Sequence, residues 1–530
     1  MKRLVVVFGL STALGCSPRA SESTGIDTWA GDFELASAVD LIQLSRLRRI
    51  DGTLFIHHHA GQSSLQLSSL VEIRGDLVVE SLPSSGSGLR VELPGLLQLG
   101  GGIRLSAAGD PITLSAPRLG RADFVELREG QFGLELDQLI ELRGRLRVED
   151  VDLESLRLPA LRALQGDLRL RRARPVGGEM VDEMWVEAEL PISLPSLVDL
   201  DGSLELRQTG TFALVAPALD ALGGSLIVEA GTVRLEFEKL RVLDGSLRIE
   251  DAVFDLQTPG LVRVRGALEV VSSTFTGAPT LDRLRTLDLG QLEHIEGNLR
   301  VRDVKGLESV ALSSLAAIDG SLQLSGLPAL AEVDLSKLSS LPSDLRLERL
   351  AMPEVRLDAL GNVEGSLVVE DLTRLELVAP LLTTIGQSLE VERSELSELR
   401  LPALSDIGRS LFLRQSTLPA LTTLEHLTRI GVDLELSDGS GTRTFDLPLL
   451  ERIGGGLNDQ LGDLEVLRNT HLSSLVFPRL TRVLGAIEIR DNPALDPVAL
   501  SSSLAGVEAT TTRTCGNGGE ADCRRVPPNG

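Results

Sequence analysis

Aromatic residues are scarce in this chain of 530 residues, which has no tyrosine, two tryptophans and twelve phenylalanines. Leucine, valine and isoleucine must therefore form most of any core. Such a composition suits a stack of many similar thin layers better than the irregular core of an enzyme. It also argues against a polysaccharide-cleaving site, which needs clustered carboxylates, usually beside aromatic platforms for the sugar rings.

Basic residues are in deficit, and the formal net charge is -24. This charge favours solubility and makes attraction to nucleic-acid phosphate or to an anionic lipid surface unfavourable. The acidic residues are spread along the chain without a dense acidic tail, so we interpret most of them as solvated exterior positions. We expect no nucleic acid among the partners.

Long apolar runs are also missing, since no stretch reaches the roughly eighteen apolar residues of a membrane span. The apolar run 4–10 follows Lys2 and Arg3 and leads to Ala13-Leu14-Gly15-Cys16, the layout of a signal peptide with a lipobox. This segment resembles the bacterial lipoprotein signal. The resemblance implies a signal peptide over 1–15, lipidation of Cys16 and a location in the cell envelope. Ser17 stands where Asp would be the retention signal, which implies sorting to the outer membrane, on its periplasmic or its outer face.

Only three cysteines are present. If Cys16 takes the lipid, Cys515 and Cys523 remain as a pair around a flexible loop, and we expect a disulfide in an oxidising compartment. A metal site with two thiolates is the alternative, but it needs further ligands and no histidine is near. We assign no metal and no small-molecule cofactor.

The chain is repetitive. A cluster Gly-x-Leu-x-(Leu, Ile or Val) recurs, most often every 21 to 23 residues, and with looser copies it occurs about eighteen times. Clear copies begin at Gly52, Gly75, Gly144, Gly166, Gly202, Gly224, Gly245, Gly266, Gly297, Gly320 and Gly365. Between copies lies a second signature, Leu-x-Leu-Pro-x-Leu, as in 156–161 and 399–404. Alternation of apolar and polar residues between Gly and Pro corners predicts two short strands per repeat.

The repeat predicts a stack of rungs, each one circuit of a β-solenoid. Leucines point inward, charged neighbours point outward, Pro occupies a corner and Gly supplies the unusual φ of a bend. No rung buries its apolar side alone, so stability comes from stacking on its neighbours. We expect a tether over 16–30, the solenoid over 31–495, and a C-terminal cap over 496–530 with a short helix at 498–507, the disulfide loop and a disordered tail.

This pattern resembles the receptor L domain repeat of the insulin and epidermal growth factor receptor families, over roughly 31–495. The resemblance implies an all-β, right-handed parallel β-helix of about eighteen rungs. In the animal receptors it also implies a face that binds protein ligands, but no ligand-contact motif carries over to residues of this chain. The leucine-rich repeat is the nearest rival, and it would show an Asn or Cys ladder after its strand, which we do not find in the sequence.

The longest departure from the period is the 36 residues from Gly166 to Gly202. Insertions in solenoids emerge as loops on one face, and such loops often carry recognition. The alternative is a degenerate rung with no ligand. The candidate binding residues in this insertion are Arg171, Arg172, Arg174 and Trp185.

Two other features have structural explanations. Aspartates recur six residues after the repeated glycine, where Asp starts turns, and a Ca²⁺ ladder is the weaker alternative. The cluster His57-His58-His59 falls at the same point and is interpreted as a solvent-facing turn, with incidental metal binding as the alternative. The aspartates are Asp150, Asp251, Asp303, Asp371 and Asp491.

No catalytic motif stands out, such as a Gly-x-Ser-x-Gly elbow or an HExxH helix. The sequence therefore predicts a non-enzymatic, lipid-anchored envelope or surface protein. Its solenoid would serve protein recognition, adhesion or envelope structure, with a protein ligand as the possible partner. A β-helical enzyme acting on polysaccharide and a passive structural spacer are the alternatives.

Overall fold

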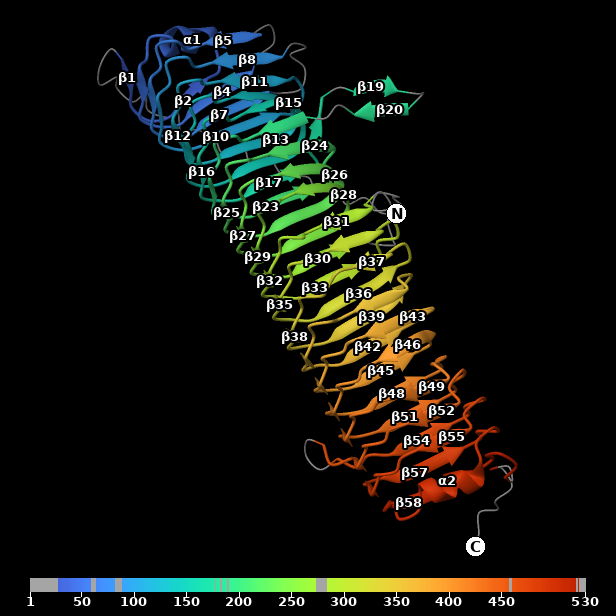
Figure 1. Cartoon of the computed structure of the whole chain (residues 1–530). Helices are drawn as coiled ribbons and strands as arrows, with labels where there is room; N and C mark the ends of the chain where they lie inside the picture. Colours follow the sequence, from blue (N-terminus) through green and yellow to red (C-terminus); the bar gives the residue numbers. More distant parts are fainter. Residues whose placement is uncertain are drawn as a thin grey trace, which may run out of the picture.

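The chain is an elongated β-solenoid, shown in Figure 1. The computed structural model describes residues 27–58, 63–81, 88–176, 178–181, 184–187, 190–272, 284–456, 460–520 and 523. In these residues nearly all secondary structure is parallel β, with two short helices, and the chain makes about 20 stacked rungs. The predicted all-β solenoid of parallel strands is confirmed, with slightly more rungs than the sequence indicated.

Each rung has three straight segments, of which the first is the strand that follows the repeated glycine. In one rung these segments are β7 (Leu77–Ser81), β8 (Leu89–Glu92) and β9 (Gln98–Leu99). In the rung of β15 one long strand covers the first two segments, and β16 (Ala163–Leu164) is the third. The first-segment strands, in chain order, are β2 (Phe33–Leu35), β4 (Leu54–His58), β7 (Leu77–Ser81), β10 (Ile103–Ala107), β13 (Val125–Glu135), β15 (Leu146–Arg157), β17 (Leu168–Arg171), β23 (Leu204–Arg207), β26 (Leu226–Glu236), β28 (Leu247–Gln257), β30 (Leu268–Val271), β33 (Leu299–Arg302), β36 (Leu322–Leu327), β39 (Leu345–Leu350), β42 (Leu367–Glu370), β45 (Leu389–Glu392), β48 (Leu411–Arg414), β51 (Leu434–Ser437), β54 (Leu464–Leu467), β57 (Ala486–Arg490) and β58 (Thr511–Cys515).

Apolar side chains stack in register along the solenoid. Leu54 pairs with Leu77, which pairs with Ile103 of the next rung, and all three are fully buried. Alternation places these side chains inside and their neighbours on the outer face of the parallel sheet. The same pattern holds in the described rungs before β58, so each of these rungs completes its core only against its neighbours.

The repeated glycine has a different role from the predicted one. From Gly144 to Gly266 its φ is not positive, so it supplies no unusual bend. A Cβ on Gly224 would instead meet the carbonyl carbon of Gly202, one rung earlier, at 2.6 Å. In these rungs glycine is favoured because backbone stacks closely on backbone at this corner. Later rungs place Gln387, Arg409 and Val432 at the same position.

The left-handed conformation lies at the position six residues after that glycine. Asp150, Asp251, Asp303, Asp371 and Asp491 have φ between 50° and 57° there, a conformation that Asp tolerates. The predicted turn is not general, because Asp150 and Asp251 lie within the continuous strands β15 and β28.

Arginines occupy the same position in other rungs and pair with an aspartate of the rung before. Arg393 donates to Asp371 at 2.8 Å, and Arg468 donates to Asp438 at 2.6 Å. Of the five recurring aspartates, Asp150 and Asp371 are engaged in ion pairs of this kind. Within the described residues, no three His, Cys, Asp or Glu side chains are grouped so as to hold a metal ion.

Structure extends beyond the predicted solenoid boundaries of 31–495 at both ends. β1 (Thr28–Trp29) lies within the segment interpreted as a tether, and α1 (Ala38–Leu44) is a helix that the repeat pattern did not indicate. At the other end, α2 (Pro497–Ser503) forms close to where a helix was predicted. β58 then adds one more strand in parallel with β57, and the predicted disulfide joins Cys515 to Cys523 directly after it.

The last rungs contain an asparagine ladder, so the expectation that the chain lacks one is wrong there. Asn469, Asn492 and Asn517 are buried one above the other. The side-chain amide of Asn492 donates to the Val466 carbonyl at 2.9 Å, and its oxygen accepts from the Asn469 N–H at 2.9 Å. The ladder satisfies backbone groups at the corner where other rungs place Ser394 or an apolar residue.

We predict that Gly224→Ala lowers the free energy of unfolding by about 1–3 kcal/mol, because the new methyl group forces two stacked rungs apart. Urea unfolding followed by circular dichroism measures the change. Gly120→Ala is the matched control, since nothing lies within 4 Å of its Cβ position and its φ is ordinary. Equal stability of the two variants would contradict close stacking at the glycine corner.

Candidate functional site

The long insertion forms a β-hairpin that stands away from the solenoid (Figure 1). β19 (Gly178–Val181) and β20 (Met184–Glu187) pair in a two-stranded sheet of their own, with Met180 opposite Trp185. Among the described strands this is the one antiparallel pair. The sequence located this departure from the period but did not indicate its hairpin form.

Both ends of the insertion are fixed to the solenoid. Before the hairpin, β18 (Arg174–Pro175) pairs with β15, and after it β21 (Leu190–Ser193) pairs with β24 (Thr211–Val215). Ala173 and Ile192, close to the two attachment points, are fully buried. The solenoid thus continues on both sides of the hairpin, which leaves the strand stack intact.

The three candidate arginines lie just before the hairpin in different settings. Arg172 has a left-handed φ of 47° and pairs with Asp150, with Nη2 2.5 Å from Oδ2, so it joins two rungs. This bond lowers the pKa of the Asp150 carboxyl. Arg171 and Arg174 are exposed and form no ion pair with the described part of the chain. They are therefore the arginines with charge available to a partner.

A shallow depression of about 370 Å³ lies beside Arg171 on the outer face of the main sheet. Most of its charges are neutralised locally: Arg169 pairs with Glu205 at 2.8 Å, and Arg207 with Glu229 at 2.9 Å. The hydrogen bond to Glu205 raises the pKa of Arg169. Arg171 is the guanidinium in this depression that lacks such a partner among the described residues. The residues lining the depression are Arg147, Glu149, Arg169, Arg171, Glu205, Arg207, Gln208 and Glu229.

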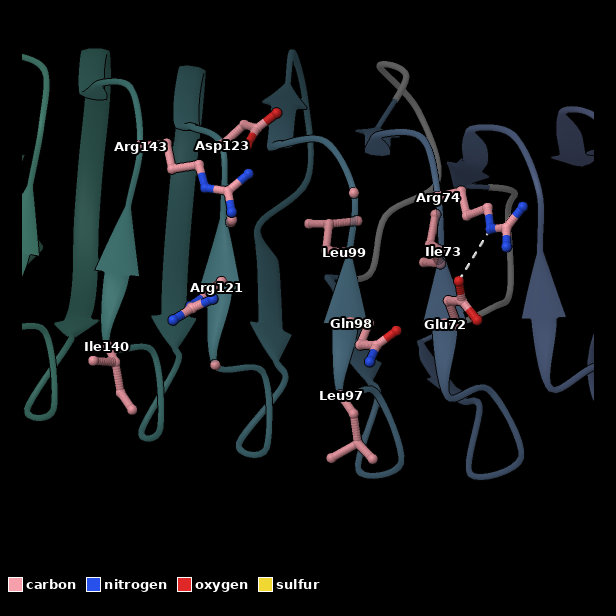
Figure 2. A pocket seen from close by; sticks show the side chains of 13 residues that line it. Glu72, Ile73, Arg74, Leu97, Gln98, Leu99, Arg121, Asp123, Ile140 and Arg143 are labelled. Atoms are coloured by element: carbon pink, nitrogen blue, oxygen red, sulfur yellow. Dashed lines mark hydrogen bonds and ion pairs between the residues drawn. The ribbon is translucent and has the colours of Figure 1, made fainter.

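A second depression, of about 470 Å³, lies where the third-segment ladder is interrupted (Figure 2). The sheet that contains β9 ends there, and a new sheet begins at β12 (Arg121–Ala122). The Ile140 N–H donates to the Gly120 carbonyl of the rung before it at 2.8 Å. The Leu97 carbonyl holds the equivalent position one rung earlier, but no described N–H donates to it. The interruption leaves backbone groups of two rungs open to water.

A one-residue deletion explains the interruption. Three residues separate the third and first segments in neighbouring rungs, as between Leu99 and Ile103, but only two separate Ala122 from Val125. Asp123 takes the glycine position, where its N–H donates to the Gly101 carbonyl and its carbonyl accepts from the Gly144 N–H. The ring of Phe124, the next residue, lies where a Cβ on Gly102 would be. The depression is lined by Arg74, Arg121 and Arg143 together with Glu72 and Asp123, plus exposed Leu97 and Ile140.

Paired charges cover most of the outer face of the main sheet. Glu126 has a buried side chain and lies within 3.0 Å of Arg128 and 3.5 Å of Arg104, and it also accepts from Arg145. Burial acts to raise the pKa of the Glu126 carboxyl, but the hydrogen bond from Arg145 and the nearby positive charges outweigh it, so the pKa is lowered.

Near the C-terminal end the same face carries an acidic row. Glu435, Glu465 and Glu488 are partners in three successive strands. Arg414 pairs with Glu435 at 2.5 Å and Arg490 with Glu488 at 2.7 Å. No arginine or lysine of the described residues pairs with Glu465, and burial together with its acidic neighbours raises the pKa of this carboxyl.

The histidine cluster is not a single solvent-facing turn. His57 lies on the outer face, with its ring nitrogens 3.3 Å from Glu34 and 3.5 Å from Glu80. His58 is instead buried, and its Nδ1 lies 3.1 Å from the Ser81 hydroxyl. The two rings point to opposite sides of the strand, as alternation requires. His59 lies outside the described residues.

The N-terminal predictions also concern residues outside the described ranges. The signal peptide over 1–15, the lipidation site Cys16 and Ser17 all precede Asp27, where the described structure begins. Across the residues that the structure does describe, neither helix is long and apolar enough to cross a membrane.

We predict that Glu465→Gln raises the melting temperature at pH 7. A carboxyl whose pKa is raised by folding binds its proton more tightly in the native state, so its ionisation above that pKa destabilises the fold. The gain should shrink as the pH falls toward about 4, where this carboxyl is protonated in both states. Thermal unfolding at the two pH values provides the measurement.

Glu488→Gln is the matched control in the same row, because it removes a carboxylate that Arg490 already neutralises. It should stabilise the protein less than Glu465→Gln does, because it relieves some repulsion on Glu465 but also removes the ion pair with Arg490. If Glu465→Gln has the melting temperature of the wild type at pH 7, the ionised Glu465 carboxylate does not destabilise the fold and the prediction is wrong.

Comparison with known proteins adds no relative: no protein-family model matches the chain, and no curated protein matches it.

Proposed function

We propose that this protein is a non-enzymatic recognition scaffold, anchored in the cell envelope by a lipid on Cys16, and that its β19–β20 hairpin binds a protein partner. The observation that carries the proposal is the hairpin, which projects from a solenoid whose strand stack continues on both sides of it. Recognition elements are commonly loops held by a rigid scaffold. The proposed kinship with receptor L domains is consistent with a solenoid that binds proteins.

The composition of the hairpin supports this role. Met180 and Trp185 are register partners in the hairpin, and they belong to the residue types enriched at protein interfaces. Trp185, one of only two tryptophans among the 530 residues, lies in the longest insertion. Short antiparallel strands give these residues a defined register, which lowers the entropy lost on binding.

The charges near the hairpin indicate the chemistry of the partner. Arg171 and Arg174 are exposed and carry charges that no described carboxylate neutralises. A partner that presents an apolar patch bordered by carboxylates complements this region. Pairing of these arginines with the partner's carboxylates mainly affects the rate of association and the specificity. Burial of Trp185 in the interface gives most of the affinity.

A pull-down from native envelope extract tests the hairpin. The bait is the chain from Ser17 onward, compared with a variant whose residues 177–189 are replaced by a short Gly-Ser link. We expect a partner that binds the wild type and is lost with the variant. Circular dichroism of the two should agree, because the described hairpin strands pair only with each other.

Point variants test the contribution of Trp185 to binding. Trp185→Ala should weaken binding by at least about tenfold, as expected for an interface anchor. Trp29→Ala is a matched control, since Trp29 packs at the N-terminal end against Phe33. Equal retention of every partner by the wild type and the variant without the hairpin would refute recognition through this element and favour the passive spacer.

The lipid anchor is tested separately by metabolic labelling of the full chain with a radioactive fatty acid. Label should enter the wild type and be absent from Cys16→Ser, which should also leave the membrane fraction. Labelling of the Cys16→Ser variant would contradict the anchor assignment without affecting the test of the hairpin.

A further inference from the structure

Each end of the solenoid presents strand edges without a described partner (Figure 1). β58 pairs with β57 on one side, and no described strand pairs with its other side. At the opposite end, β2 pairs with β4 and β1 pairs with β3 (Arg49–Ile50), and the outer sides of β1 and β2 have no described partner either. An open parallel edge is a template for pairing with another chain.

The main-chain groups at the two open edges are complementary. The Phe33 N–H donates to the Thr53 carbonyl of the following rung at 2.8 Å, so alternation directs the main-chain groups of Glu34 out of the N-terminal end. Thr512 holds the position of Phe33 in the last strand of the same ladder. Its N–H and carbonyl, with those of Thr514, are therefore directed out of the C-terminal end.

Continuing this register into a second copy would bring opposite charges together. Thr512 would stand beside Phe33 of the second copy, and Arg513 beside its Glu34. Arg513 is exposed, follows Glu488 in the acidic row, and forms no ion pair with the described residues. The side chain of Glu34 is 66% exposed. Opposite charges on neighbouring strands stabilise a sheet, and like charges destabilise it.

The two terminal helices fit the same arrangement. α2 forms the second segment in the rung of β57, and no described second segment follows β58. α1 forms the second segment in the rung of β2. With β2 of a second copy stacked on β58, the two helices would lie two rungs apart, which is about 9.6 Å at roughly 4.8 Å per rung. Packed helices have axes roughly 8–10 Å apart, so the missing segment leaves the space that two helices need.

The outer sides of the two helices can pack together. Val39 and Ile42 lie on the side of α1 opposite its buried leucine and are 65% and 57% exposed. The corresponding side of α2 carries Val498, which is 74% exposed, and the small residues Ser501 and Ser502. Small side chains let a second helix approach closely, and Val498 offers it an apolar contact.

We propose that this chain associates with a second copy of itself head to tail, with the β58–α2 end of one copy stacked on the β1–β2–α1 end of the next. β58 pairs in parallel with β2, Arg513 lies beside Glu34, and α2 packs on α1. Joining two C-terminal ends by antiparallel pairing centred on Arg513 would place this arginine opposite itself. Joining two N-terminal ends would bring together Asp27, Asp32 and Glu34 of both copies. A head-to-tail contact leaves one free end of each kind, so it can continue into a row.

This self-association goes beyond the proposed recognition and does not rest on it. The hairpin leaves the side of the solenoid several rungs from either end, so a row presents one hairpin for each copy. Residues 16–26 span at most about 40 Å when fully extended. Each copy in a row that lies along a membrane can therefore keep its own lipid anchor.

Sedimentation velocity of the unacylated chain from Ser17 onward tests the proposal. The weight-average sedimentation coefficient should rise with protein concentration. Arg513→Glu and Glu34→Arg should each weaken self-association by about tenfold or more, because each places like charges at the contact. Arg241→Glu is the matched control, since Arg241 is exposed near the middle of the solenoid, and it should associate as the wild type does.

Combining the two charge reversals identifies which ends meet. The double variant Arg513→Glu with Glu34→Arg should regain association. A mixture of the two single variants should regain it as well, because every end then meets an end of opposite charge. Val39→Ser with Ile42→Ser should weaken association by a similar factor if α1 packs on α2. Circular dichroism and the melting temperature check that each variant is folded.

Three results would overturn the proposal: a wild-type chain that remains a monomer at the highest concentration reached, a folded Glu34→Arg variant that associates normally, or a mixture of the single variants that does not associate. Loss of association with Arg513→Glu alone would indicate a dimer joined through two C-terminal ends, and the head-to-tail arrangement would be wrong. The experiment uses neither the envelope extract nor a hairpin variant, so it is independent of the test of recognition.

Discussion

Every rung of this solenoid depends on the rung before it and the rung after it, through parallel main-chain hydrogen bonds and a shared aliphatic interior. The tightest point of this dependence is the glycine corner, where the backbone of one rung lies against the backbone of the next. Where glycine occupies the corner, as at Gly224, an added side chain would meet the backbone of the rung before it. The close spacing between neighbouring rungs therefore limits which residues can occupy each position of the repeat.

The candidate functional features lie where the stack ends or varies. The β19–β20 hairpin leaves between β18 and β21 and does not disturb the pairing of β17 with β23. Loss of one residue before Val125 interrupts the third-segment ladder and opens a depression. The two ends are covered by α1 and α2, which differ in the polarity of their exposed sides. Recognition is thus proposed at a place that the stacking itself does not need.

Periodicity made much of the architecture predictable. The inward leucines, the strand alternation and the Pro corners follow from a two-residue period between breaks, and residues such as Leu146 and Val148 are buried as expected. The role of the glycine was wrong, because close stacking is a contact between rungs and leaves no local signature. Asp123 in the glycine position hid the strand β13. β54 was missed although Gly462, Leu464 and Val466 match the repeat, because they follow the preceding copy at an unusually long spacing.

Other features needed three-dimensional information. β58 has exposed threonines because it is the last strand, so it lacks the apolar alternation that identifies the others. α1 is seven residues long, too short to be stable alone, and forms where Leu44 packs against the first rungs. The sequence located the insertion around Trp185. It did not distinguish the pairing of Arg172 with Asp150 from the unpaired charge of Arg171, since that depends on which rungs are neighbours.

Residue-resolved hydrogen exchange tests the central claim, that a continuous ladder joins the rungs except at its identified break. The amides of Leu97 and Ile140, which donate to the preceding rung, should exchange slowly. That of Gly120, which has no acceptor among the described residues at the interruption, should exchange much faster. Slow exchange at all three sites would contradict the break, and fast exchange at all three would contradict the stacked ladder itself.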